Sequence, residues 1–180
     1  AARPDYGWLS EETPDTTERL SHDRVFILDP IDGTRAYVEG QENWALSLAV
    51  VEHGRPTAAV VAMPAKGRVY AAALGRGATR DGAPIAPSDA RLPGATLLAP
   101  RPSLEPQHWR GAAPEVQRHF RPSLAYRLAL VAEGRFDAML TLRDAWEWDI
   151  AAGAFRAAVH PWRWSRFASS PGRSSRGVPK

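Results

Sequence analysis

Two aspartates that stand three residues apart, Asp29 and Asp32, are the side chains best placed for chemistry. They follow a short apolar run at residues 25–28, which predicts a buried strand that ends at the proline between them. That proline restricts the backbone, so both carboxylates can face one point together with the carbonyl of Ile31. Carboxylate and carbonyl oxygens suit a hard cation such as Mg²⁺. The pattern therefore predicts a cation site just after a strand.

Gly33 and Thr34 come next and add a second feature. Their backbone N–H groups lie where a helix can begin, and such groups attract a phosphate. A metal site beside a phosphate site indicates phosphoryl chemistry. The alternative is an ordinary exit from a strand into a turn, because Asp, Pro and Gly all favour turns.

Three more acids extend the pattern. The pair Glu11-Glu12 precedes the strand, and Asp149 lies in Trp146-Glu147-Trp148-Asp149 ahead of the small residues at 150–154. An acid that follows tryptophans and leads into small residues is an unusual surface residue. Taken one at a time, these acids have plainer explanations: a solvated pair, and a helix N-cap at Asp149.

The elements that must position these acids are short and of mixed type. Apolar alternation bounded by turn residues predicts the strands. One helix has Ser123 as a plausible N-cap and Gly134 as a C-terminal stop. The predicted strands cover residues 25–28, 44–52, 57–63, 68–73, 95–99 and 136–142, and the predicted helices lie within 104–120, at 123–134 and at 150–154. This mixture predicts an α/β or layered α+β fold.

Together these segments resemble the inositol monophosphatase superfamily of Mg²⁺-dependent phosphatases. The similarity consists of the Glu-Glu pair, then Asp-Pro-Ile-Asp-Gly-Thr about 18 residues later, then Trp-Asp-Ile-Ala-Ala-Gly at residues 148–153. Order and spacing both agree over residues 6–154. The resemblance implies a fragment of that family's α/β/α/β/α sandwich, with a domain over residues 1–154.

The resemblance also implies two or three Mg²⁺ ions and a role for each acid. Glu11 would bind one ion, and Asp29 would bridge two. The carbonyl of Ile31 would complete the first site. Asp32 and Asp149 would hold the second ion.

The same resemblance implies the catalytic groups. Thr34 would orient or deprotonate the attacking water, and Glu12 would support the metal ligands from behind. The backbone N–H groups of Gly33 and Thr34 would bind the phosphate of the substrate.

Both ends of the chain depart from the family pattern. Family members carry further residues upstream, including an acid that pairs with the threonine, whereas this chain begins with Ala1. Downstream, residues 155–180 contain no acids, several serines and six of the 23 basic residues. We expect a chain truncated at both ends, with a basic, disordered or frame-shifted tail at 155–180.

Residues near the motifs favour one substrate branch, that of the CysQ-type 3′(2′),5′-bisphosphate nucleotidases. The indications are Arg35-Ala36-Tyr37 after the metal motif and Glu147-Trp148 before Asp149. Leu142 stands where inositol-specific members carry an acid, and it cannot accept a hydroxyl hydrogen bond. Arg143 and Asp144 could face a charged substrate or the solvent. An inositol-1-phosphate or histidinol-phosphate phosphatase, or an inactive fragment of such an enzyme, is the alternative.

Composition excludes several other classes. The chain has 180 residues, no cysteine and no apolar run of the length a membrane span needs. Lack of cysteine excludes disulfide scaffolds and is compatible with the cytoplasm. Up to residue 155 the chain has 17 basic and 20 acidic residues, and no nucleic-acid motif accompanies the basic tail. We expect a small phosphorylated substrate, no nucleic acid and no membrane span; a homodimer is an open alternative.

Overall fold

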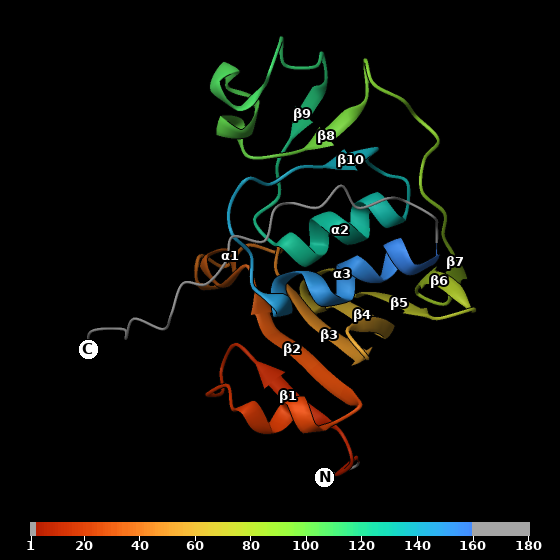
Figure 1. Cartoon of the computed structure of the whole chain (residues 1–180). Helices are drawn as coiled ribbons and strands as arrows, with labels where there is room; N and C mark the ends of the chain where they lie inside the picture. Colours follow the sequence, from red (N-terminus) through yellow and green to blue (C-terminus); the bar gives the residue numbers. More distant parts are fainter. Residues whose placement is uncertain (1–2, 160–180) are drawn as a thin grey trace, which may run out of the picture.

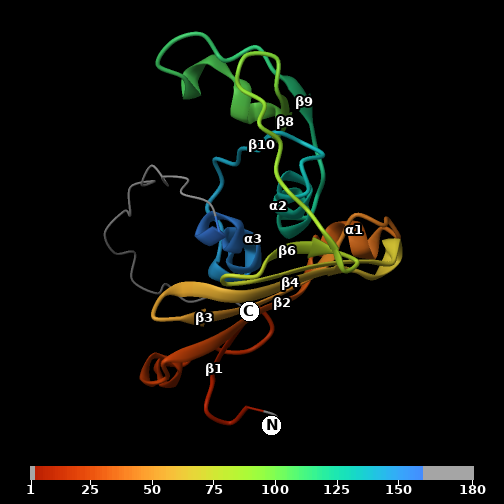
Figure 2. The same cartoon turned by 90° about the vertical axis from the view of Figure 1, so that its right-hand side faces the viewer.

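The computed structural model describes residues 3–159, and these fold into three stacked layers (Figures 1 and 2). A seven-stranded sheet and a three-stranded sheet enclose a layer formed by helices α2 and α3 (Figure 2). The large sheet contains β1 (Gly7–Ser10), β2 (Arg24–Asp32), β3 (Ala45–Glu52), β4 (Arg55–Met63), β5 (Arg68–Ala73), β6 (Gly77–Arg80) and β7 (Ala83–Pro84). The small sheet contains β8 (Thr96–Leu98), β9 (Gln117–His119) and β10 (Ala138–Met139). The α-helices are α1 (Thr34–Val38), α2 (Leu124–Ala132) and α3 (Glu147–Val159).

The large sheet is a meander from β2 to β7, because each strand pairs antiparallel with the next, while β1 pairs with β2 in parallel. Helix α1 lies in the connection between β2 and β3. Side chains alternate along each strand, so one face is buried under α2 and α3. The opposite face leaves apolar side chains partly exposed, with Leu46 at 36%, Val60 at 37% and Val69 at 46%. The core therefore lies between the large sheet and the helices.

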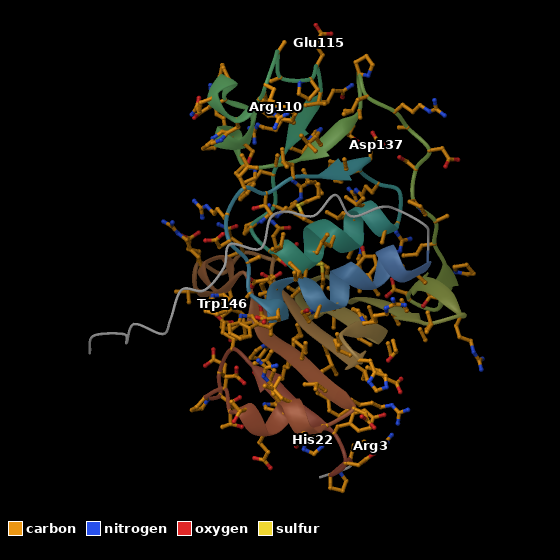
Figure 3. All side chains as sticks on the ribbon, in the orientation of Figure 1. Arg3, His22, Arg110, Glu115, Asp137 and Trp146 are labelled. Atoms are coloured by element: carbon orange, nitrogen blue, oxygen red, sulfur yellow. The ribbon has the colours of Figure 1, made fainter. Side chains whose placement is uncertain are left out.

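Short 3-10 turns and one carboxylate organise the rest. The turns are η1 (Thr17–Ser21), η2 (Pro64–Lys66), η3 (Arg101–Leu104) and η4 (Pro106–His108). Asp137, labelled beside β10 in Figure 3, accepts hydrogen bonds from the backbone N–H and the hydroxyl of Thr96, both at 2.7 Å, and from Ser88. Those bonds hold β10 against β8.

The predicted layered α/β fold agrees with this arrangement, and five predicted elements are confirmed closely: β3, β4, β5, β8 and α2. Ser123 caps α2 by accepting a hydrogen bond from the N–H of Tyr126 at 3.0 Å. At the other end, Gly134 has a φ of 73° and the N–H groups of Gly134 and Arg135 reach back to the carbonyls of Val131 and Leu130. This is a Schellman ending, in which glycine takes the left-handed position without strain.

Four predictions about elements were wrong. The strand at 25–28 does not end at the proline: β2 continues to Asp32 through a register shift between Asp29 and Asp32, where an extra residue leaves Pro30 outside the ladder. Residues 104–120 hold only short 3-10 turns and β9, because prolines interrupt that stretch. The strand at 136–142 shrinks to the two residues of β10. Helix α3 spans Glu147–Val159, so it begins before Asp149 and extends beyond the helix predicted at 150–154. Residues 160–180 lie outside the described part, and the domain boundary at 154 stays a prediction.

Candidate metal centre

Three aspartates from two elements meet at one point. Asp29 and Asp32 lie at the bulged end of β2, and Asp149 lies in the first turn of α3. Each offers a carboxylate oxygen, and these atoms all lie within 4.8 Å of one another. We call these three residues the acidic cluster.

Asp29 lies deepest in the acidic cluster, with 1% of its surface exposed. Its Oδ1 accepts a hydrogen bond from the N–H of Ile31 at 2.9 Å, which fixes the carboxylate inside the bulge. Burial raises the pKa of Asp29 to about 8, and the charges of Asp32 and Glu11 add to that rise. Without a cation, this carboxylate therefore holds a proton near neutral pH.

Asp32 is held by the start of α2. Its Oδ2 accepts hydrogen bonds from the hydroxyl of Ser123 and the N–H of Ala125, both at 2.6 Å. Burial nevertheless raises the pKa of Asp32, while these hydrogen bonds oppose the rise. One oxygen of Asp32 is thus bound to the protein, and the other oxygen is left to face the cluster.

Asp149 is positioned by the beginning of α3. Its Oδ2 accepts a hydrogen bond from the N–H of Trp146 at 2.8 Å, a residue labelled in Figure 3. The predicted N-cap role for Asp149 is therefore wrong: Asp149 is the third residue of the helix, and its carboxylate reaches back to the N–H of the residue before the helix, as the acid of a capping box does. Ser47 on β3 donates a hydrogen bond to the carbonyl of Trp148 at 3.3 Å, which ties the start of α3 to the large sheet.

Glu11 and Glu12 follow β1 and are both exposed. The N–H of Glu11 donates to the carbonyl of Leu28 at 3.3 Å, so the parallel pairing of β1 with β2 brings Glu11 next to Asp29. Desolvation raises the pKa of Glu11, and a hydrogen bond with Asp29 opposes that rise. The charges that raise it further belong to Glu12, Asp149 and Asp32. Both glutamates therefore lie at the edge of the acidic cluster.

The turn after β2 places the remaining predicted residues. Gly33 has a φ of 89°, and a side chain there would lie 3.3 Å from the carbonyl oxygen of Asn43 and from Cβ of Ser123. Thr34 is exposed, and its hydroxyl donates to the carbonyl of Ile31 at 3.0 Å. A carbonyl oxygen has two lone pairs, so that of Ile31 keeps one for another partner.

Two side chains beside Asp32 could not be linked to the acidic cluster from the sequence. Ser123 was interpreted only as a helix cap, yet it also binds Asp32, which lies 91 residues earlier. Arg127 is buried, with 7% of its surface exposed, and its Nη1 has no hydrogen-bond partner among the described residues. Burial lowers the pKa of Arg127, while the charge of Asp32 opposes that effect and the charge of Arg143 adds to it. A buried basic residue on an otherwise apolar helix was the only available signal.

The loop before α3 carries the residues predicted to face a substrate. Leu142, Arg143 and Asp144 are all exposed. The positive charge of Arg143 lies close enough to lower the pKa of Arg127.

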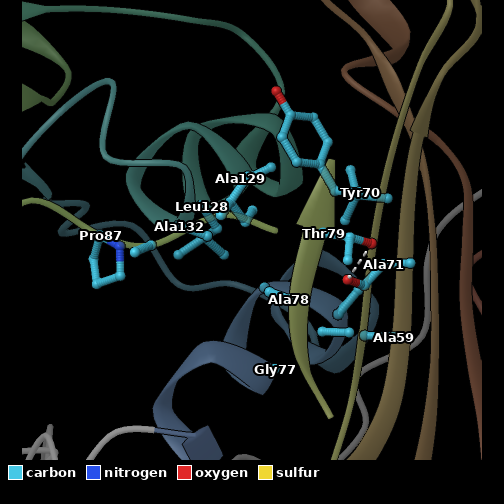
Figure 4. A pocket seen from close by; sticks show the side chains of 16 residues that line it. Ala59, Tyr70, Ala71, Gly77, Ala78, Thr79, Pro87, Leu128, Ala129 and Ala132 are labelled. Carbon is cyan, nitrogen blue, oxygen red and sulfur yellow. Dashed lines mark hydrogen bonds between the residues drawn. The ribbon is translucent and has the colours of Figure 1, made fainter. Parts of the chain in front are cut away.

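An apolar cavity of about 180 Å³ lies elsewhere, between α2, α3 and strands β4 to β6 (Figure 4). Its walls are mainly alkyl groups, including Ala59, Ala132, Leu128 and Ile85. No carboxylate lines it, so it is unsuited to a cation or a phosphate.

The acidic cluster fits a hard divalent cation. Negative charges crowded together in the acidic cluster repel one another, which contributes to the raised pKa values of Asp29 and Asp32, and a cation removes that repulsion. The oxygen-only donor set excludes thiolate chemistry and suits Mg²⁺ or a similar ion.

Within residues 3–159, no helix has the length and apolar character needed to cross a membrane.

Fold and cluster together define a layered α/β protein with three clustered carboxylates that fit a cation. The comparisons identify its family: the model described as the inositol monophosphatase family matches residues 1–155. The chain belongs to the inositol monophosphatase family.

Individual relatives carry different activities in their names. The 3′-phosphoadenosine 5′-phosphate phosphatase of Mycobacterium bovis is 36% identical over 95% of this chain and 64% of its own length. The inositol-1-monophosphatase of Rhizobium meliloti is 37% identical over 84% of this chain and 60% of its own length. The crystal structure of inositol monophosphatase-II from Staphylococcus aureus superposes with a TM-score of 0.73 at 28% identity, covering 86% of this chain and 62% of that one. The chain thus spans less than two thirds of the length of these relatives.

Proposed function

We propose that this protein is a Mg²⁺-dependent phosphomonoesterase, most like a 3′(2′),5′-bisphosphate nucleotidase that converts adenosine 3′,5′-bisphosphate to AMP and phosphate. The observation that carries the proposal is the convergence of Asp29, Asp32 and Asp149 beside Glu11. Family membership supports the same reaction class.

In this proposal the acidic cluster holds the ions. Asp29, Asp32, Asp149 and Glu11 provide carboxylates, and the carbonyl of Ile31 provides one more oxygen. Bound Mg²⁺ would lower the pKa of a water and offset charge on the leaving oxygen. Two or three ions are proposed by resemblance to the family.

The turn after β2 would handle the phosphate and the water. The hydroxyl of Thr34 donates a hydrogen bond to the carbonyl of Ile31, so the hydroxyl oxygen can accept a hydrogen bond from the attacking water. The backbone N–H groups of Gly33 and Thr34 would bind phosphate oxygens, and Glu12 would support Glu11 from the edge. Water adds to phosphorus, the bond to the ribose 3′ oxygen breaks, and the water's proton ends on that oxygen.

The environment of Arg127 favours a substrate that carries a second anionic group. The guanidinium of Arg127 donates a hydrogen bond through Nε to the carbonyl of Ser123 at 3.3 Å, but its buried Nη1 has no partner among the described residues, which is costly. A second phosphate could accept from it, with Arg143 nearby to add positive charge. An inositol monophosphate offers no such second group.

An alternative substrate has specific support. An inositol-1-phosphate phosphatase is supported by the 37% identity to an inositol-1-monophosphatase. A histidinol-phosphate phosphatase stays a further alternative. Localisation in the cytoplasm and homodimer formation stay predictions.

The test is Mg²⁺-dependent phosphate release from adenosine 3′,5′-bisphosphate, inositol 1-phosphate and histidinol phosphate. We expect the nucleotide to be preferred, and Arg127→Gln to raise its KM more than that of inositol 1-phosphate. Preference for inositol 1-phosphate would select the alternative substrate. Failure of all three substrates, both here and with a chain extended to the relatives' length, would contradict the proposal.

A further inference from the structure

A basic pocket of about 420 Å³ lies apart from the acidic cluster. Its basic side chains come from separate segments: Lys66 from η2, Arg68 from the start of β5, and Arg121 and Arg135 from either side of α2. Glu42, Asn43 and Tyr126 complete the lining. None of the carboxylates of the acidic cluster lines this pocket.

The charge of the pocket is opposite to that of the chain around it. Four basic side chains and one carboxylate line it, whereas acids outnumber bases in the chain up to residue 155. Like charges gathered around a hollow repel one another and create a positive potential inside it. An anion in the pocket would remove that repulsion.

The hydrogen-bond donors are only partly used. Lys66 Nζ binds Glu42 Oε2 at 3.0 Å, and Arg121 Nη1 donates to the carbonyl of Phe120 at 2.7 Å. Neither Arg68 nor Arg135 has an ion-pair partner within the described residues 3–159. Two guanidinium groups are therefore available, and their planar donor pattern matches phosphate oxygens.

Two lining segments also contact the turn that follows the acidic cluster. The carbonyl of Asn43 lies against Gly33, and Arg121 precedes Ser123, which binds Asp32. We propose that the basic pocket is a second anion site, which binds a phosphate group separately from the acidic cluster. The ligand is either free phosphate or the phosphate of a small ester, since both present the same oxygens.

The experiment is a calorimetric titration with inorganic phosphate in EDTA, at constant ionic strength set with chloride. Removal of cations leaves the acidic cluster repelling phosphate, so only the basic pocket should bind. We expect saturable binding to one site, weakened about tenfold or more in the double variant Arg68→Gln/Arg135→Gln, because each loses a charge-assisted hydrogen bond.

The matched control is Arg55→Gln/Arg76→Gln, which removes two exposed arginines that do not line the pocket. It should bind phosphate normally, and circular dichroism should show that both double variants are folded. Competition with AMP distinguishes the sources: displacement of phosphate indicates that esters enter, and no displacement restricts the site to the free ion. The proposal is overturned by a lack of saturable binding or by an equal loss of binding in the control double variant. These binding outcomes do not depend on turnover, so they are separate from the fate of the proposed phosphatase activity.

Discussion

At the scale of single residues, the acidic cluster gathers negative charges at a buried point, which favours the protonated form of Asp29. Asp29 has its pKa raised to about 8 by burial and by its neighbours. Asp32 is restrained by Ser123 and Ala125. A cation should therefore compete directly with protons for these oxygens.

Replacement of Asp32 by asparagine tests this directly. Asparagine keeps an oxygen that accepts from Ser123 and Ala125 but loses the charge that attracts a cation. We expect Mg²⁺ affinity to fall beyond the roughly 10–100-fold typical of losing an outer partner. Isothermal titration calorimetry measures it, with Asp144→Asn, an exposed acid outside the cluster, as control. Equal affinity in Asp32→Asn and the unchanged protein would defeat the assignment.

The raised pKa of Asp29 gives a pH dependence with a definite sign. A carboxyl whose pKa is higher in the folded state stabilises the fold below its unfolded pKa, and that contribution is lost as pH rises towards about 8. In EDTA we expect a lower Tm at pH 8 than at pH 5. Mg²⁺ affinity should change in the opposite direction and increase between pH 6 and pH 8. Thermal melts and titrations across this range check both trends, and an ion affinity that is flat with pH would contradict the explanation.

The sequence identified the acids but not what holds them. Asp29 and Asp32 share a short motif, so their proximity follows from spacing alone, and Asp149 was added through a second motif. Ser123 could not be linked to Asp32, because a cap signal is local and the hydrogen bond spans 91 residues. Arg127 was hidden for the same reason: its lack of a partner is a property of packing.

At the scale of elements, α2 and α3 must approach closely enough to carry Ser123 and Asp149 to the same place. Gly153 permits that approach: a Cβ on it would lie 2.6 Å from Cβ of Leu128 and would clash with the rest of that side chain. The small residues after Asp149 were correctly predicted as helix. The reason that these residues are small is a close contact between helices α2 and α3, which is visible only in the fold.

Substitution of Gly153 by alanine should therefore destabilise the protein, although alanine favours a helix. We expect a loss of about 1–3 kcal/mol, the usual cost of overpacking. Chemical denaturation measures it. Gly111→Ala is the control, because a side chain there meets nothing within 4 Å and should leave stability nearly unchanged. An unchanged denaturation midpoint in Gly153→Ala would contradict the tight contact.

Elements differed in how well their sequences specified them. Helix α2 was predicted well because Ser123 and Gly134 mark both ends with local chemistry. The prediction of a helix within 104–120 was wrong because the apolar residues of this stretch stand among prolines, which favour 3-10 turns there. Strand β2 was predicted too short, since a bulge can carry a proline through a strand and spacing alone does not reveal it.

At the scale of the whole molecule, all residues of the acidic cluster and their hydrogen-bond partners lie within residues 3–159. We therefore expect a chain that ends at Val159 to bind Mg²⁺ with the affinity of the 180-residue chain. Titration of the two proteins side by side is the measurement. A collapse of binding in the shorter chain, with the helical circular dichroism signal lost, would show that residues 160–180 belong to the fold.

The long-range hydrogen bonds around the acidic cluster imply that the cluster forms late in folding. Asp32 finds its donors 91 and 93 residues later in the chain, and Ser47 finds Trp148 101 residues later. Such distant contacts form slowly, because closing long loops costs entropy before any contact offsets it. On the ribosome, β2 emerges well before α3, and its buried carboxylates must wait unpaired until most of the chain has been synthesised. Cation binding is therefore a late event in the life of each new molecule, and it marks the completion of folding.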